Sequence, residues 1–474
     1  MKLTAQKKTG LVSTAITIVV ILCLVVTNIV AYVLTEKYPI TIDLTSNKAF
    51  QLSQESIDYI SKLENEIEIT VMNSRNSFAS GGEYFEQAMS VIEQYEKYNS
   101  NITLKFVDLV TNPTWASQYG NLDVDVNDIV VSSGENTEKL TVYDIFNVQQ
   151  SWYGASITSS NAENAMTGAI MNVVTEDKPV VTFLTGHEES EDSNFESILE
   201  KNGFEVKQIM LQTEDVPEDT DIIVSVAPLR DYTEEDIVKL NQFMRQDTES
   251  TPVIMYFASS EQSDLPVLEE WLATWGIGVG NGLVAETNSN KLISNNAFYG
   301  VADIKDLSYT EHMARTDLPI AFPFSRPVEL LFSTNMGYTT SEVLSYSETS
   351  GLVDENVQKI EDIVLSGPIT VAAQSVYTKD DIQAKLIVFG SDMLTYADFL
   401  NSSSLMNMEY MLSCFNTLAQ RENVFNIAPK VLGGGSFTLN QGSLLMYTVL
   451  LVIVIPVVVL AVGLTVWVRR KRRQ

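Results

Sequence analysis

The amino-acid sequence predicts an α/β protein in which two exposed α/β domains lie between an N-terminal and a C-terminal transmembrane helix. Two observations predict this class. Strand-like and helical patterns alternate through most of the chain, which is the order of layered α/β domains. Two long apolar runs, residues 11–33 and 444–468, lie near the two ends. Each run exceeds the roughly 20 helical residues that cross the hydrocarbon core of a bilayer.

Basic residues beside the two apolar runs set their predicted orientation. They precede the first run and directly follow the second: Lys7, Lys8, Arg469, Arg470, Lys471, Arg472 and Arg473. Since basic flanks stay on the cytoplasmic side, both termini are expected in the cytoplasm. We therefore expect residues 1–35 to hold a cytoplasmic tail and the first membrane helix, and residues 469–474 to form a basic tail. The large segment between the helices is expected outside the cell membrane.

The segment between the membrane runs is strongly acidic. The tails hold eight of the 30 Lys and Arg and none of the 61 Asp and Glu, which leaves 22 basic against 61 acidic residues, a net charge of −39. Nucleic acid is not an expected partner, because phosphate binding needs clustered Lys and Arg. A cationic ligand or partner and a simply solvated acidic surface are both consistent with this charge. Cys414, the single cysteine of this segment, allows no intrachain disulfide there and favours a bacterial surface.

Residues 36–176 are expected to form the first exposed domain. Ser53 has the pattern of a helix N-cap before an apolar stripe. A helix is predicted over residues 85–95, and strands are predicted at 66–72, 102–107, 129–131 and 140–142. This order of elements resembles a thioredoxin-like layout. The chain has no C-x-x-C motif, so no redox chemistry is predicted.

Residues 177–420 are expected to form the second exposed domain. Buried strands are predicted at 179–184, 221–226, 252–257 and 386–389, with helices starting near Thr233 and Pro266. This alternation predicts a mostly parallel, doubly wound sheet. Polar stretches at about 281–380 indicate an insertion of irregular loops with a few strands. The last helix is expected at 406–418, and residues 421–443 form a linker to the second membrane run.

The most interesting polar turn of the chain is Gly186-His187-Glu188-Glu189, which directly follows the first strand of the second domain. Ligands of doubly wound sheets bind beyond the carboxyl ends of strands. His187 and Glu189 could therefore be metal ligands, an acid/base pair, or residues that contact a partner or change conformation. The simpler interpretation is a turn before an acidic helix start. One histidine does not fix a metal geometry, so neither a metal nor a cofactor is predicted.

Other candidate nucleophiles lack the surroundings that their chemistry needs. Ser259 and Ser260 follow a predicted strand, but the glycines of G-x-S-x-G are missing. Cys414 lies inside the predicted last helix and is expected to pack there. The chain has no P-loop motif, so any ATPase must be another subunit. We predict no catalytic residue and expect the chain not to be an enzyme. A hydrolase or amidase that uses His187, with Ser259 or a metal, remains the alternative.

Several segments resemble the Gldg family, auxiliary components of ABC-type transport systems that are named for gliding motility. The matching segments are residues 42–45, 51–53, 183–189, 275–277, 389–392 and 427–430, followed by the second membrane run and its arginine cluster. The resemblance implies a second domain similar to class I glutamine amidotransferases. The nucleophilic cysteine of those enzymes has no counterpart at the matching position here. The resemblance therefore implies a binding or mechanical domain, with an ABC permease and a separate ATPase subunit as partners.

The sequence thus predicts a non-enzymatic, membrane-anchored accessory subunit of an ABC-type transport complex. Its exposed domains are expected to bind a substrate or an envelope partner and to couple to the permease. Besides the hydrolase, a second alternative is a stand-alone structural or adhesion protein of the envelope, which would form no stable complex with an ATPase.

Overall fold

The computed structural model describes Val19, Leu22, Val26 and most of residues 48–432. The gaps in the latter range are 120–121, 152–153, 191–192, 247–249, 314–317, 354–362, 380–381, 403, 422–426 and 428. Apart from those first three residues, the predicted membrane helices lie outside the described part, as do Lys7, Lys8 and Arg469 to Arg473. Among the described residues, no helix is both long and apolar enough to cross a bilayer.

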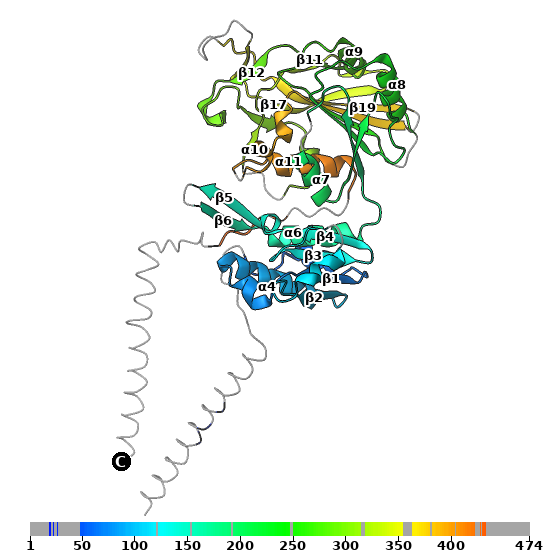
Figure 1. Cartoon of the computed structure of the whole chain (residues 1–474). Coiled ribbons are helices and arrows are strands. Elements are labelled where there is room, and N and C mark those ends of the chain that lie inside the picture. The colour runs from blue at the N-terminus through cyan, green and yellow to red at the C-terminus, as the bar shows by residue number, and fades with distance from the viewer. Residues whose placement is uncertain are drawn as a thin grey trace, which may run out of the picture. The chain divides into compact units, whose positions relative to one another are not determined.

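The chain divides into two compact units, one of residues 52–432 and one of the two chain ends. The larger unit is a mixed α/β fold with several sheets, and the class that the sequence predicts is confirmed at this level (Figure 1). Each of its two main sheets has a buried apolar core of its own.

The first sheet has four strands in the order β2-β1-β3-β4. Their bounds are β1 (Ile67–Val71), β2 (Ile102–Phe106), β3 (Ile129–Ser133) and β4 (Asn136–Leu140). β1 is parallel to β2 and antiparallel to β3, and β3 and β4 are antiparallel. The strand predicted at 140–142 corresponds to β4, which ends at Leu140. Residues 142–145 instead form a short helix, α5 (Val142–Ile145).

Helices cover this sheet. They are α2 (Gln54–Ile60), α3 (Arg75–Ala79), α4 (Glu83–Tyr98) and α6 (Ala162–Val174), with the 3-10 helix η1 (Pro113–Tyr119). α2 begins as predicted, because the side chain of its N-cap Ser53 accepts a hydrogen bond from Ser56 N. The hairpin of β5 (Phe146–Ser151) and β6 (Gly154–Ser160) precedes α6. The apolar faces of α4 and α6 are buried with β1 and β3 in one core.

The second sheet has ten strands, and five of them are mutually parallel. In spatial order these are β8 (Glu205–Met210), β7 (Val180–Thr185), β9 (Ile222–Val226), β10 (Val253–Phe257) and β20 (Ile382–Phe389). β9 and β10 are buried along their whole length, which explains why they read as continuous apolar runs. Helices α7 (Ser193–Lys201) and α11 (Asn407–Leu418) contribute to one core cluster of this sheet, and α8 (Glu234–Phe243) and α9 (Pro266–Thr274) contribute to the other.

The predictions of a mostly parallel sheet and of an irregular insertion at 281–380 are both wrong in part. β17 (Tyr338–Ser345) and β19 (Thr370–Lys379) extend the sheet antiparallel beyond β20. β17 alternates exposed and buried positions over its first half, so it carries polar residues that resemble a loop in the sequence. The other elements from 277 onward are β11 (Ile277–Val279), β12 (Leu283–Glu286), η2 (Ser289–Lys291), β13 (Val301–Ile304), η3 (Leu307–Thr310), β14 (Ile320–Ala321), β15 (Val328–Leu330), β16 (Thr334–Asn335), β18 (Ser350–Val353), η5 (Met393–Thr395) and α10 (Ala397–Leu400).

Candidate functional site

The predicted polar turn lies at the point where the strand order of the large sheet reverses. Along the parallel part, the strands stand in the order second, first, third, fourth and fifth by their place in the chain. The reversal falls between β7 and β9, and ligands of open α/β sheets bind outside the carboxyl ends of the strands at such a position. β7 ends at Thr185, directly before Gly186 and His187. The turn therefore occupies the position where this kind of sheet most often binds a ligand.

Backbone hydrogen bonds join this turn to the loop after β9. The carbonyl oxygen of His187 accepts from Leu229 N at 3.0 Å and from Arg230 N at 2.9 Å. Gly186 has a φ of +108° and Glu188 a φ of +59°, which turn the chain sharply on both sides of His187. A Cβ at Gly186 would lie 3.0 Å from Met210 Cγ, so space also favours glycine there. Backbone hydrogen bonds and close packing at Gly186 thus stabilise this turn.

The imidazole of His187 is buried between two carboxylates. Its side chain is 1% exposed, and those of Glu189 and Asp236 are each 2% exposed. Nε2 lies 3.2 Å from Asp236 Oδ2, within hydrogen-bonding distance. Nδ1 lies 3.4 Å from Glu189 Oε1, an ion-pair contact whose geometry falls short of a hydrogen bond. The ring also stacks on Tyr232, with a centroid distance of 4.2 Å.

Both carboxylates are held by further donors. Asp236 lies in the first turn of α8, where its Oδ2 accepts from Thr233 N at 2.8 Å and from Thr233 Oγ1 at 2.6 Å. Asp236 N donates in return to Thr233 Oγ1, which completes a capping box. Glu189 Oε2 accepts from the backbone N of His187 at 2.6 Å, and its Oε1 from the Tyr232 hydroxyl at 3.4 Å. We call these four residues, His187, Glu189, Tyr232 and Asp236, the His187 cluster.

The charges of the cluster favour a protonated His187. Burial opposes the imidazolium, but Glu189 and Asp236 outweigh it, so that the pKa of His187 is raised above its usual value. Burial, and then the charge of Glu189, raises the pKa of Tyr232 well above its usual value, which keeps its hydroxyl as a donor. A general base needs a neutral ring that reaches a substrate. In the cluster the ring of His187 instead faces two carboxylates and a tyrosine.

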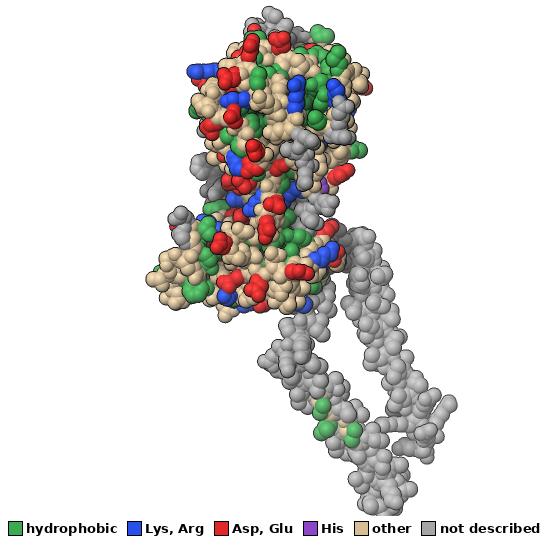
Figure 2. Space-filling model, turned by 90° about the vertical axis from the view of Figure 1, so that its right-hand side faces the viewer, with side chains coloured by type: hydrophobic (Ala, Val, Ile, Leu, Met, Phe, Trp, Pro, Cys, Tyr) green, Lys and Arg blue, Asp and Glu red, His purple; other side chains and the backbone are tan. Residues whose placement is uncertain are grey.

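Glu188, the third residue of the predicted turn, points to the surface instead. It forms an ion pair with Arg230 at 2.5 Å, and the two side chains are 53% and 69% exposed. Such an exposed pair adds little to stability. On the face that Figure 2 shows, acidic side chains are scattered among basic and apolar ones. Glu188 of the turn and Arg230 of the loop after β9 are therefore exposed to a partner.

Neither Ser259 nor Cys414 forms a hydrogen bond with a residue of the His187 cluster among the described contacts. Ser259 follows β10, where its Oγ accepts from Glu261 N at 3.2 Å, and its side chain also bonds Asp392 after β20. Cys414 is buried in α11, and burial raises the pKa of its thiol. Among the described residues, no group of His, Cys, Asp and Glu is placed to hold a metal ion. The described contacts of His187 therefore include none of the candidate nucleophiles Ser259, Ser260 and Cys414.

Sequence reasoning missed Asp236 and Tyr232 as neighbours of His187. The sequence identifies Asp236 only as an acidic residue in the first turn of a predicted helix, where a negative charge interacts favourably with the helix dipole. The T-x-x-D spacing from Thr233 is a capping-box signal, so its side-chain geometry was open to prediction. Its contact with His187 spans 49 residues of sequence and depends on how the sheet is ordered.

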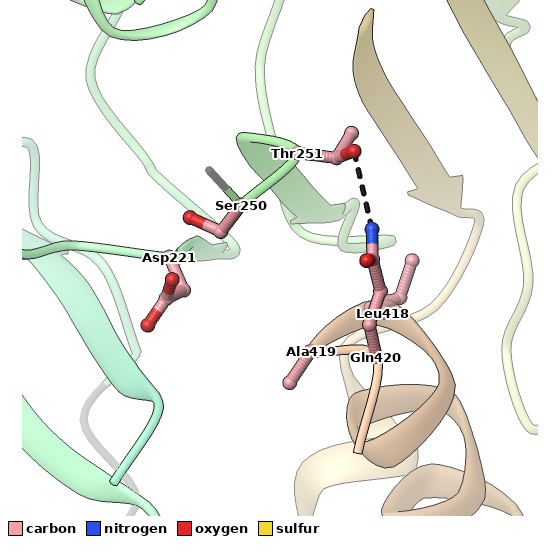
Figure 3. A pocket seen from close by; sticks show the side chains of 6 residues that line it. All are labelled: Asp221, Ser250, Thr251, Leu418, Ala419 and Gln420. Carbon is pink, nitrogen blue, oxygen red and sulfur yellow. Dashed lines mark hydrogen bonds between the residues drawn. The ribbon is translucent and has the colours of Figure 1, made fainter. Parts of the chain in front are cut away.

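A small pocket lies at the other end of the parallel strands (Figure 3). It has a volume of about 240 Å³ and is lined by Asp221, Ser250, Thr251, Leu418, Ala419 and Gln420. Asp221 precedes β9 and Thr251 precedes β10, so this is the amino end of the strands. Gln420 Nε2 donates to Thr251 Oγ1 at 3.2 Å across it. The pocket is thus separate from the strand ends at which the His187 cluster lies.

Comparison with known proteins finds similarity along most of the chain. Residues 46–148 match a family described as a domain of unknown function, DUF7088. An uncharacterized protein of Borreliella burgdorferi is 21% identical over 489 residues, which cover 91% of this chain and 93% of that protein. The mmIFT52 N-terminal domain is 14% identical, with a TM-score of 0.38, over 52% of this chain and 100% of that domain. PurLQS from Thermotoga maritima is 15% identical, with a TM-score of 0.29, over 51% of this chain and 99% of that chain.

Proposed function

We propose that the chain is a non-enzymatic accessory subunit of an ABC-type transport complex, of the kind found in the Gldg family. Two membrane helices at its ends anchor it in a bacterial cell membrane, with both termini in the cytoplasm. The exposed part has a thioredoxin-like first domain and a second domain similar to class I glutamine amidotransferases. It binds a substrate or an envelope partner, and the membrane helices couple it to a permease that recruits a separate ATPase.

The observation that carries the non-enzymatic part of this proposal is the closed His187 cluster. A doubly wound sheet normally presents its reactive groups at the reversal of strand order. Here that position holds an imidazole that is 1% exposed and that contacts two carboxylates. The arrangement joins the loop after β7 to the start of α8, which supports a binding or mechanical role. Glu188 and Arg230 give this edge an exposed polar surface for a partner.

The membrane arrangement rests on the sequence and supports an accessory role. A domain anchored at both ends stays at the membrane surface, where packing of its helices can hold it beside a permease. The absence of a P-loop motif in the sequence means that ATP hydrolysis has to come from another subunit. ATP-driven movement of the permease can then change the conformation of the exposed unit only if the two membrane helices contact the permease differently in its different states.

Labelling of introduced cysteines in intact cells tests this topology. Ser80 is exposed in the first domain, so Ser80→Cys is expected to react with a membrane-impermeant maleimide. Gln474→Cys is expected to react only after the membrane is permeabilised. The unmodified chain is the control, because Cys414 is buried and burial raises the pKa of its thiol. Labelling of Gln474→Cys in intact cells would contradict the proposed topology.

A further inference from the structure

A buried carboxylate of the first domain, Glu163, is the strongest feature that the proposed function does not yet use. It lies in the first turn of α6, and its side chain is 2% exposed. Its Oε1 accepts from Ser53 N at 2.5 Å and from Ser56 Oγ at 2.8 Å. Ser53 is the N-cap of α2, the helix that follows the first apolar run in the sequence. One oxygen of Glu163 therefore holds the start of α2.

The other oxygen of Glu163 binds the segment that leads to the second apolar run. Lys430 Nζ lies 2.5 Å from Glu163 Oε2, and the lysine side chain is 12% exposed. A buried carboxylate needs such a cation, because removal of one partner of a buried ion pair leaves an uncompensated charge. The Glu163 side chain thus contacts both chain segments that lead toward the predicted membrane helices, one through each carboxylate oxygen.

The segment around Lys430, described at residues 427 and 429–432, makes several polar contacts with the rest of the unit, and we call these residues the return segment. Lys430 and Ser160 exchange two backbone hydrogen bonds, of 2.7 and 2.8 Å. Ile427 N donates to Asn164 Oδ1 at 3.1 Å, and Leu432 N to the Tyr84 hydroxyl at 3.2 Å. None of the described residues of the return segment is fully buried. A segment with little apolar burial opens at a low free-energy cost compared with a core strand.

The far end of α6 contacts the second domain. Asn172 Nδ2 donates to the carbonyl oxygen of Lys201, the last residue of α7, at 3.0 Å. Arg421 Nη1 donates to Asn202 O at 2.7 Å, and its Nη2 lies 3.6 Å from the Met171 sulfur. Glu163 therefore lies at the start of α6, and the residues near the end of α6 contact the region that follows α7. A shift of α6 would change the contacts of both domains.

We propose that the Glu163–Lys430 ion pair is a releasable clamp that couples the two chain ends to each other and, through α6, to the second domain. This role rests on the proposed function, since movement of the membrane helices is what opens the clamp. In the closed state Lys430 neutralises Glu163. When the return segment detaches, Glu163 becomes a lone charge that must reach water, which also removes the acceptor from Ser53. The return segment and the start of α2 therefore loosen together.

Amide hydrogen exchange of the full-length chain in mild detergent tests the clamp. In Lys430→Met, exchange is expected to rise roughly tenfold or more in both residues 53–60 and the return segment, while β9 and β10 keep their protection. The double variant E163Q/K430M should restore residues 53–60 to near the wild-type rate, because a neutral Gln still accepts from Ser53 and leaves no buried charge. Arg75→Met, which removes the exposed Arg75–Glu93 pair of the same domain, is the matched control and should change neither segment.

Two results would overturn the clamp. One is faster exchange in the return segment alone, with residues 53–60 unchanged in Lys430→Met. The other is a double variant whose residues 53–60 exchange as fast as in the single variant. Either result would reduce Lys430 to a local contact of the return segment.

A second arm uses the wild-type chain and so does not depend on any variant folding. In a purified complex with a permease and an ATPase, addition of ATP with vanadate is expected to change exchange in residues 53–60 and in the return segment together. A complex in which neither segment responds would overturn the coupling while leaving the accessory function in place. Failure to recover any complex would instead count against the proposed function, and exchange in the isolated chain would still decide the clamp.

Discussion

Below pH about 6.5, where the imidazole is protonated, replacement of His187 by alanine is expected to lower the free energy of unfolding of the exposed unit by about 3–5 kcal/mol, the usual cost of breaking a buried ion pair. The reason is the pair of carboxylates that the change leaves behind. Glu189 and Asp236 are each 2% exposed and would face each other without a cation. The stacking contact with Tyr232 is lost as well. Chemical denaturation of the full-length chain, followed through tryptophan fluorescence, measures the change.

The stabilisation by His187 should depend on pH in a defined direction. The pKa of His187 is raised in the folded chain by Glu189 and Asp236 against the opposing effect of burial, so the folded state binds the proton more tightly than the unfolded state. The contribution is therefore fully present below the unfolded pKa of about 6.5 and is lost as pH rises through the higher folded pKa. The difference in stability between the wild type and His187→Gln should shrink over that interval.

His312 supplies a matched control, because it is the second of only two histidines. Burial lowers its pKa, so its protonation favours the unfolded state. Protonation of His312 therefore destabilises the folded state. This destabilisation is absent above pH about 6.5 and grows as pH falls through about 6.5 and the lower folded pKa. His312→Gln should therefore gain stability relative to the wild type at acidic pH. A His187→Gln profile parallel to that of the wild type would contradict the charged His187 cluster.

Gly390→Ala is expected to destabilise the fold around the ten-stranded sheet by about 3 kcal/mol or more, at the upper end of what overpacking costs. Gly390 directly follows β20, where three chain segments meet. A Cβ there would lie 2.2 Å from the carbonyl oxygen of Arg326 and 2.6 Å from Ser325 Oγ. The backbone cannot move away easily, because Arg326 N donates to Gly390 O and Gly390 N to Val371 O, both at 2.8 Å. Thermal unfolding of the variant measures the loss.

Gly168→Ala is the control for this substitution. Gly168 lies inside α6, and a Cβ there would meet nothing within 4 Å. Alanine in a helix interior is better than glycine by roughly 0.5–1 kcal/mol, so this variant should be slightly more stable than the wild type. Equal effects of the two substitutions would show that the crowding at Gly390 is relieved by movement of its neighbours.

Local signals of the sequence predicted the elements of the fold well. The N-caps Ser53 and Thr233 begin α2 and α8 because a side-chain oxygen within the same turn satisfies the free backbone donors. β7 lies at Val180–Thr185, against a predicted 179–184, because a strand buried on both faces is a continuous apolar run. The predicted last helix at 406–418 is α11 at Asn407–Leu418. These features depend on a few neighbouring residues.

Features that depend on distant residues were not predictable in this way. β19 is antiparallel to β20, and β17 is antiparallel to β19. The sequence of β17 resembles a loop because half of the strand carries exposed polar side chains. The sequence placed His187 at a turn, but its pairing with Asp236 follows from the adjacency of β7 and β9. Glu163 gave no signal, since its partners Ser53 and Lys430 lie at opposite ends of the folded unit's sequence.

Purification of the tagged full-length chain from its native membrane in mild detergent, with mass spectrometry of what accompanies it, tests the central claim most directly. The accessory role predicts recovery of a polytopic permease and of a P-loop ATPase in fixed proportion to the chain. Recovery of the chain alone, with the protected amides of β9 and β10 showing that it is folded, would contradict an accessory subunit of a transport complex.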